Sequence, residues 1–183
     1  MVVFDTSFLS LAFDSEFSPP IDPATGQAMV DCKGKIEHLI SSLAASKSRI
    51  LIPTPVLAEF MIRGGPDKEK RLSIITNSKI FVVAPFDLRS AVECALIEDE
   101  DTATKRLQDE NVSKAKIKFD RQILAIALTR SASTIFTGDK KLAYRAQQCG
   151  LSATLTWQLD SPPTKPQLNL PFPSPQASSS AQQ

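Results

Sequence analysis

The chain has 183 residues, 42% of them hydrophobic, and carries 21 Lys and Arg against 20 Asp and Glu. This length fits one globular domain, and a formal net charge of +1 excludes a whole-chain field that would attract nucleic acid. No apolar run approaches the roughly 18 residues of a membrane span and no basic segment opens a secretory signal, so we expect a soluble, cytoplasmic protein without membrane contact.

Zinc chemistry and histidine-based catalysis are poor candidates for this chain. Cys32, Cys94 and Cys149 are scattered without a Cys-x-x-Cys pair, which favours reduced, mostly buried thiols. His38 is the only histidine, and its segment is typical of a helix surface. Catalytic triads and histidine-rich zinc sites are therefore not expected, and any chemistry should depend on carboxylates.

Strand-like and helix-like patterns alternate along the chain. Short apolar, β-branched runs predict strands, and apolar residues at helical periodicity predict helices. In chain order we expect a strand at 2–4, helices at 8–13 and 31–44, a strand at 49–52, helices at 55–63 and 66–77, a strand at 79–84, a long helix starting near 87, a helix at 115–131, a strand at 133–136, a helix at 140–148 and an edge strand at 152–157. This alternation argues for an α/β domain with a mainly parallel sheet and right-handed crossovers.

Two polar segments have a structural interpretation. Thr6 and Ser7 can cap the first helix, because their hydroxyl oxygens accept hydrogen bonds from free backbone N–H groups. The acidic run at 98–101 is interpreted as a solvated helix face, since four adjacent acids point to different sides of a helix.

The domain boundaries follow from composition. Residues 14–30 contain several Pro and turn-forming residues, which predicts an irregular insertion. From residue 161 onward Pro, Ser and Gln dominate, leaving too little apolar surface to offset the entropy of ordering. We therefore predict a folded domain at 1–160 and a disordered tail at 161–183.

Four carboxylates are expected at one edge of the sheet. Asp5 ends the first strand, and Asp139 follows the strand at 133–136. Glu59 lies in the first turns of the helix after the second strand, and Asp120 is expected to begin a helix. Because the carboxyl ends of parallel strands line a common crevice, these side chains can converge although they are distant in sequence.

Such a cluster of acids needs a cation to balance its negative charge. Neighbouring like charges raise one another's pKa, so four ionised acids are costly without a counter-ion. Oxygen ligands without a soft donor fit Mg²⁺ or Mn²⁺ rather than zinc or copper. Because Mg²⁺ keeps several waters and commonly binds phosphates, hydrolysis of a phosphodiester is the chemistry we expect.

The segments around these acids resemble, in order and spacing, the acidic motifs of the PIN-domain family. The four segments are Val2-Val3-Phe4-Asp5-Thr6-Ser7, Pro55-Val56-Leu57-Ala58-Glu59-Phe60, Phe119-Asp120-Arg121-Gln122-Ile123-Leu124-Ala125-Ile126-Ala127 and Ile135-Phe136-Thr137-Gly138-Asp139-Lys140-Lys141-Leu142. The resemblance implies a Rossmann-like three-layer α/β/α sandwich and metal-dependent RNA cleavage, as in VapC-type toxins of toxin–antitoxin pairs. The insertion at 14–30 is longer than in compact toxins.

The resemblance also implies roles for individual residues. The acidic quartet that performs catalysis and binds Mg²⁺ or Mn²⁺ would be Asp5, Glu59, Asp120 and Asp139. Thr6 or Ser7 would orient these ligands through hydrogen bonds, and Thr137 would do the same beside Asp139. Expected partners are an RNA substrate, a small antitoxin protein and a second copy of the chain, docked through the apolar face of 36–44.

Basic and aromatic side chains near the acids could contact RNA. The candidates for phosphate contacts are Arg63, Lys118, Arg121 and Lys140, with Lys141 beside them. Each is equally open to interpretation as a solvated surface charge. For base stacking, Phe17 and Phe86 are the candidates, because most other Phe residues lie on apolar faces.

Two other functions compete with the endoribonuclease. One is a PIN-like module that binds RNA or protein without catalysis; the presence of all four acids argues against it. The other is a phosphatase with Asp5 as nucleophile, but that chemistry normally uses a second acid nearby, and Thr6-Ser7-Phe8 supplies none.

Overall fold

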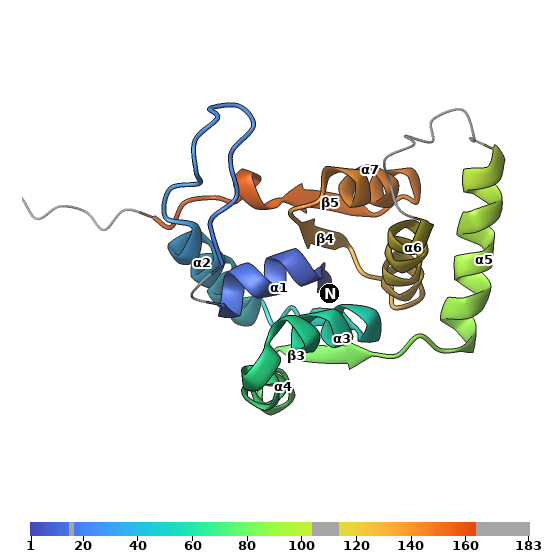
Figure 1. Cartoon of the computed structure of the whole chain (residues 1–183), viewed down its shortest axis with the longest axis horizontal. Coiled ribbons are helices and arrows are strands. Elements are labelled where there is room, and N and C mark those ends of the chain that lie inside the picture. The colour runs from blue at the N-terminus through green and yellow to red at the C-terminus, as the bar shows by residue number, and fades with distance from the viewer. Residues whose placement is uncertain (15–16, 104–113, 164–183) are drawn as a thin grey trace, which may run out of the picture.

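The computed structural model describes residues 1–14, 17–103 and 114–163 (Figure 1). The side chains of the acidic run at 98–101 and residues 164–183 of the predicted tail lie outside the described residues. No helix among the described residues combines the length and apolar character needed to cross a membrane.

A five-stranded sheet forms the centre of the domain. Its strands are β1 (Val2–Phe4), β2 (Ile50–Pro53), β3 (Phe81–Ala84), β4 (Thr134–Thr137) and β5 (Ser152–Leu155). They lie in the order β3-β2-β1-β4-β5, and every neighbouring pair is parallel. The parallel α/β sheet expected from the sequence is confirmed.

Helices connect the strands and cover the sheet. They are α1 (Thr6–Phe13), α2 (Cys32–Ala45), α3 (Thr54–Arg63), α4 (Lys68–Asn77), α5 (Leu88–Ala103), α6 (Lys114–Thr129) and α7 (Lys140–Gln148), with short 3₁₀ turns η1 (Gly65–Asp67) and η3 (Thr156–Gln158). The chain moves from β1 outward to β3, then crosses back to β4 and on to β5. Right-handed crossovers therefore place α1–α4 on one face of the sheet and α5–α7 on the other, giving three layers.

Aromatic packing fixes the start of α1 against the sheet. Phe4 on β1, Phe8 on α1 and Phe136 on β4 are all buried, with ring centroids 4.4 to 5.6 Å apart. Tilted and edge-on pairs of this kind contribute about 0.5–1.5 kcal/mol beyond the area they bury. This cluster holds the carboxyl ends of β1 and β4 in register with the first turn of α1.

Three details differ from the sequence prediction. The cap of α1 is Asp5, whose side chain accepts from the Phe8 N–H, so Thr6 and Ser7 belong to the first helical turn. Asp120 lies inside α6 rather than at its start, because the helix begins at Lys114. The last strand ends at Leu155, where the chain turns into η3.

The apolar face of 36–44 serves the domain itself. Ile36 is buried, and Leu39, Ile40 and Leu43 pack against the core. Leu39, Ile40 and Leu43 keep part of their surface exposed. A dimer contact through the exposed part of this face stays a prediction.

The insertion is irregular over its described part, as expected. Between residues 17 and 30 the only pairing is an isolated antiparallel bridge between Ile21 and Ala28, with a turn that Asp22 closes by accepting from the Ala24 N–H. The insertion then leads directly into α2, whose cap is Asp31, the residue predicted to begin this helix.

Candidate active site at the carboxyl ends of β1 and β4

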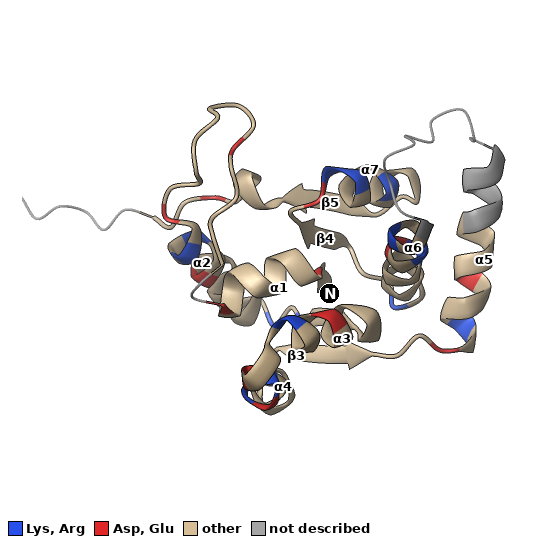
Figure 2. Ribbon diagram, in the orientation of Figure 1, with Lys and Arg blue, Asp and Glu red and all other residues tan. Residues whose placement is uncertain are grey.

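The site lies where the strand order reverses. β1 and β4 are neighbours, yet the connections that leave them run in opposite directions along the sheet. Open parallel sheets bind ligands at such switch points, in the crevice beyond the carboxyl ends of the strands. In Figure 2 acidic positions at the start of α1, on α3 and at the start of α7 border this region, with basic positions on α6 and α7 beside them.

Asp5 is held rigidly at the end of β1. It is 5% exposed, and its carboxylate accepts hydrogen bonds from the Phe8 N–H at 2.8 Å, from the Ser7 hydroxyl and from the Thr137 hydroxyl. The Ser7 hydroxyl in turn accepts from the Gly138 N–H at 2.9 Å. The first turn of α1 and the end of β4 thus fix one carboxylate together.

Asp139 is the cap of α7. Its Oδ1 accepts from the backbone N–H groups of Lys141, at 2.7 Å, and Leu142, at 3.3 Å. Its own N–H donates to the Thr137 hydroxyl at 2.9 Å, and its Oδ2 pairs with the Lys116 ammonium. Thr137 therefore bridges Asp139 and Asp5.

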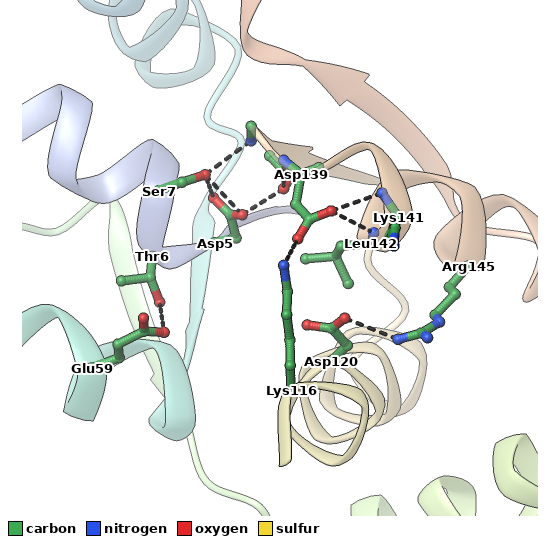
Figure 3. Close-up of polar contacts among 12 residues, drawn as sticks. Asp5, Thr6, Ser7, Glu59, Lys116, Asp120, Asp139, Lys141, Leu142 and Arg145 are labelled. Carbon is green, nitrogen blue, oxygen red and sulfur yellow. Dashed lines mark hydrogen bonds and ion pairs between the residues drawn. The ribbon is translucent and has the colours of Figure 1, made fainter. Parts of the chain in front are cut away.

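Asp120 approaches the same place from α6. Its carboxylate is nearly buried and pairs with the Arg145 guanidinium of α7, Nη1 to Oδ2, at 3.0 Å. Figure 3 shows Asp5, Asp120 and Asp139 around a common region, with Lys116 extending from α6 to Asp139. Three segments far apart in sequence thus bring three acids together.

The negative charges of these acids raise the pKa values of their neighbours. Burial raises the pKa of Asp5 to about 6, against hydrogen bonds from Thr137, Phe8 and Ser7, and the charge of Asp139 adds to the rise. Burial likewise raises the pKa of Asp120 to about 6, against Arg145, with Asp139 and Asp5 adding to the rise. For two of the acids the charged form is therefore disfavoured in the absence of an added cation.

Asp139 behaves differently from the other two acids. Burial acts to raise its pKa, but the Lys116 ammonium and the N–H groups of Lys141 and Leu142 outweigh burial and lower it. The ion pair with Asp139 is also the largest cause of the raised pKa of Lys116. Asp139 thus keeps its charge to lower pH than the other two acids, and Lys116 is its counter-ion.

Glu59 lies at the margin of the group. Its Oε2 accepts from the Thr6 hydroxyl at 2.8 Å, and its Oε1 pairs with Arg63, one helical turn along α3, at 2.6 Å. Thr6 directly follows Asp5, so this hydrogen bond ties α3 to the start of α1. Of the two hydroxyls predicted to orient the acids, Ser7 contacts Asp5 and Thr6 contacts Glu59.

The other basic residues predicted to contact RNA have varied surroundings. The ammonium of Lys140 lies 5.5 Å from the ring centroid of Trp157, Lys118 is exposed and Arg121 is half-buried. The candidate stacking residues Phe17 and Phe86 are about one-third exposed, at 36% and 37%. RNA contacts by any of them stay a prediction.

Two cations of the site were missed in the sequence. Lys116 lies four residues before Asp120, so helical geometry places both on one face, and that spacing was a usable signal. The sequence prediction chose the nearer residues Lys118 and Arg121, which project from other sides of the helix. Arg145 pairs with an acid 25 residues away, and only the fold brings them together.

The donor chemistry of the site fits a hard divalent cation. The converging side chains offer carboxylate oxygens, and burial raises the pKa of two of them. As they stand, no three Asp, Glu, His or Cys side chains of the described residues are gathered closely enough to hold an ion. Three of the acids pair with Lys or Arg side chains, so a metal ion would have to compete with these side chains for carboxylate oxygens.

Comparison with known proteins supports the fold. No family model matches the sequence, and no curated protein matches it. A crystal structure of VapBC2 from Rickettsia felis bound to a promoter DNA fragment has a similar chain, at 15% identity over 85% of this chain and 98% of that chain, with a TM-score of 0.57. DNA-bound VapBC from Salmonella typhimurium is similar at 17% identity over 85% and 97%, with a TM-score of 0.52. The chain thus has the PIN-like fold that the sequence predicts, and identities this low establish the fold alone.

Proposed function

We propose that this chain is a divalent-metal-dependent endoribonuclease that hydrolyses RNA phosphodiester bonds. The observation that carries the proposal is the group formed by Asp5, Asp120 and Asp139, three mutually coupled carboxylates from separate segments at the switch point of a PIN-like sheet. These three residues, with Glu59 at the margin, would hold Mg²⁺ or Mn²⁺. The chemistry that such an ion supplies is Lewis acidity toward the phosphoryl oxygen and a more reactive water at neutral pH.

The chain's own residues would prepare this chemistry by fixing the acids. Ser7, Thr137 and the Phe8 N–H hold Asp5 in one orientation, and two N–H groups of α7 hold Oδ1 of Asp139. Ligands fixed in this way need little reorganisation when a cation arrives. Arg63 and Lys140 border the group and are proposed to contact the RNA backbone without reading bases.

An antitoxin is the proposed protein partner. The support is the similarity to chains from two VapBC complexes, both bound to DNA. A homodimer and a cytoplasmic location belong to the same proposal. A light-scattering mass of one chain would count against the homodimer, and co-purification with a small protein encoded beside this chain would support the antitoxin.

The test of catalysis is RNA cleavage by matched variants. We expect Asp5→Asn and Asp120→Asn to lose at least roughly a hundredfold in Mg²⁺- or Mn²⁺-dependent cleavage of mixed single-stranded RNA while keeping the fold. The matched control is Asp67→Asn, which removes an exposed acid that stands at the cap of α4 without a side-chain cap hydrogen bond. Undiminished cleavage by both site variants would remove the proposal, and RNA binding without any cleavage by the wild type would favour a silent binding module.

A further inference from the structure

Lys116 has a position that the proposed nuclease function does not explain. Its side chain rises from the first turn of α6, beside Asp120, and its ammonium ends on Oδ2 of Asp139 (Figure 3). Both Asp139 and Asp120 raise its pKa through their charges. The Lys116 ammonium thus lies among the acids that would bind a metal, while 51% of the Lys116 side chain is exposed.

The two oxygens of Asp139 are not equivalent. Oδ1 accepts from two backbone N–H groups of α7, which cap the helix and cannot move away without unwinding its first turn. Only Oδ2 remains for a metal ion, and Lys116 binds that oxygen. The pair between Asp120 and Arg145 is different, because Arg145 binds Oδ2 and no contact of Oδ1 is seen among the described residues.

A lysine ammonium and a divalent cation compete for this oxygen, because both are positively charged. A dication and an ammonium a few ångströms apart repel each other, and they repel more strongly at the lower effective dielectric of a partly buried site. An ammonium on a flexible four-carbon stem can leave at small cost, and it is a good point-charge partner for phosphate. The exposed side of Lys116 gives it access to a substrate backbone at the same site.

We propose that Lys116 is a built-in counter-ion that competes with the divalent metal for Oδ2 of Asp139 and exchanges this carboxylate for an RNA phosphate when the metal binds. This inference rests on the proposed function. In the metal-free protein Lys116 keeps Asp139 ionised and in place. In the loaded protein the same ammonium neutralises the phosphate that lies next to the acids.

The proposal predicts opposite effects on metal and on RNA when the charge is removed. In Lys116→Gln, Mn²⁺ measured by titration calorimetry without RNA should bind roughly tenfold more tightly than in the wild type, since a repelling charge is lost. The KM for single-stranded RNA at saturating Mn²⁺ should rise severalfold. A residue with a merely structural role would not tighten metal binding.

Two control variants keep the test decisive. Lys79→Gln removes an exposed lysine just before β3, at the amino edge of the sheet and opposite the site, so its Mn²⁺ affinity should equal that of the wild type. Lys116→Arg keeps the charge and should not bind Mn²⁺ more tightly. Circular dichroism and thermal melting of each variant establish that the fold is retained.

The outcomes separate this inference from the proposed function. A wild type that binds no Mn²⁺ overturns the metal site and, with it, both proposals. A wild type that binds Mn²⁺ and cleaves RNA, beside a Lys116→Gln variant with unchanged Mn²⁺ affinity, overturns only the role of Lys116. Tighter Mn²⁺ binding with an unchanged KM also overturns it, because the ammonium then makes no exchange to phosphate.

Discussion

At the scale of single residues, one hydroxyl connects the two acids that follow β1 and β4. Thr137 is fully buried, donates to Asp5 and accepts from the Asp139 N–H. One side chain thus orients a carboxylate and the backbone that carries the next one. Both acids therefore depend on this one hydroxyl for their orientation.

Loss of this hydroxyl should cost stability and metal affinity together. Thr137→Val leaves a buried carboxylate and a buried N–H each short of one hydrogen bond, which we expect to lower the free energy of unfolding by about 1–3 kcal/mol. Urea denaturation measures this loss, and Mn²⁺ calorimetry should show weaker binding. Thr137→Ser keeps the hydroxyl and should recover most of both; equal behaviour of the two variants would contradict the role of the hydroxyl.

At the scale of elements, a buried arginine connects α1, α3 and α4, and α3 carries Glu59 at the margin of the site. Arg71 on α4 pairs with Asp14 at the end of α1 at 2.7 Å, donates to the Phe60 carbonyl of α3 at 3.1 Å and lies over the Phe60 ring. A side chain at position 64 would clash with it, since a Cβ there would lie 2.6 Å from Arg71 Cδ. The arginine therefore fixes α1, α3 and α4 relative to one another.

Replacing this arginine should destabilise the domain. Arg71→Met keeps much of the apolar stem but removes one partner of a largely buried ion pair, and we expect a loss of about 3 kcal/mol in the free energy of unfolding. The control Lys70→Met changes an exposed neighbour on the same helix and should stay within about 0.5 kcal/mol of the wild type. A melting temperature of Arg71→Met equal to that of the control would contradict the role of Arg71 in fixing these helices relative to one another.

The elements were largely predictable because hydrophobic periodicity is a local signal. Strands at 2–4 and 133–136, and the helix at 140–148, match β1, β4 and α7 to within one residue at each end. The helix predicted at 115–131 matches α6 to within two residues at each end, so the placement of Asp120 at a helix start did not agree with that range. The role of the face of 36–44 was not decided by the sequence, because an apolar stripe looks the same whether it covers its own core or another chain.

The site was only partly predictable, for a physical reason. Asp5 and Asp139 each follow a strand directly, so their position at the carboxyl edge follows from the sheet alone. Pairing of the acids with cations depends on how α6 and α7 pack, and sequence carries no direct signal of that.

At the scale of the whole molecule, the raised pKa values link the site to stability. Asp5 and Asp120 have folded pKa values of about 6 against 3.8 for the ordinary group. Between these values the folded state binds more protons than the unfolded state, so the free energy of unfolding falls as the pH rises through this window. Asp139 has a lowered pKa, and its stabilising contribution is lost only when the pH falls below its ordinary value.

The metal-free protein should therefore be more stable at pH 5 than at pH 7.5. Each of the two acids contributes about 1.4 kcal/mol to this difference, because only the part of its pKa shift above pH 5 falls in this range. Urea denaturation in the presence of a chelator measures the difference. Asp120→Asn should make the free energy of unfolding less dependent on pH. A wild type whose free energy of unfolding increases from pH 5 to pH 7.5 would show that the pKa values of the two acids are not raised in the folded state.

The central claim is that a divalent cation binds among carboxylates brought together from separate parts of the chain. A crystal of the wild-type protein grown with Mn²⁺, measured at the manganese absorption edge, tests it most directly. We predict an anomalous difference peak within ligand distance of Asp5, Asp120 and Oδ2 of Asp139, with the Lys116 ammonium displaced from that oxygen. A map at saturating Mn²⁺ without a peak among these acids, and with Lys116 still bound to Asp139, would contradict the account.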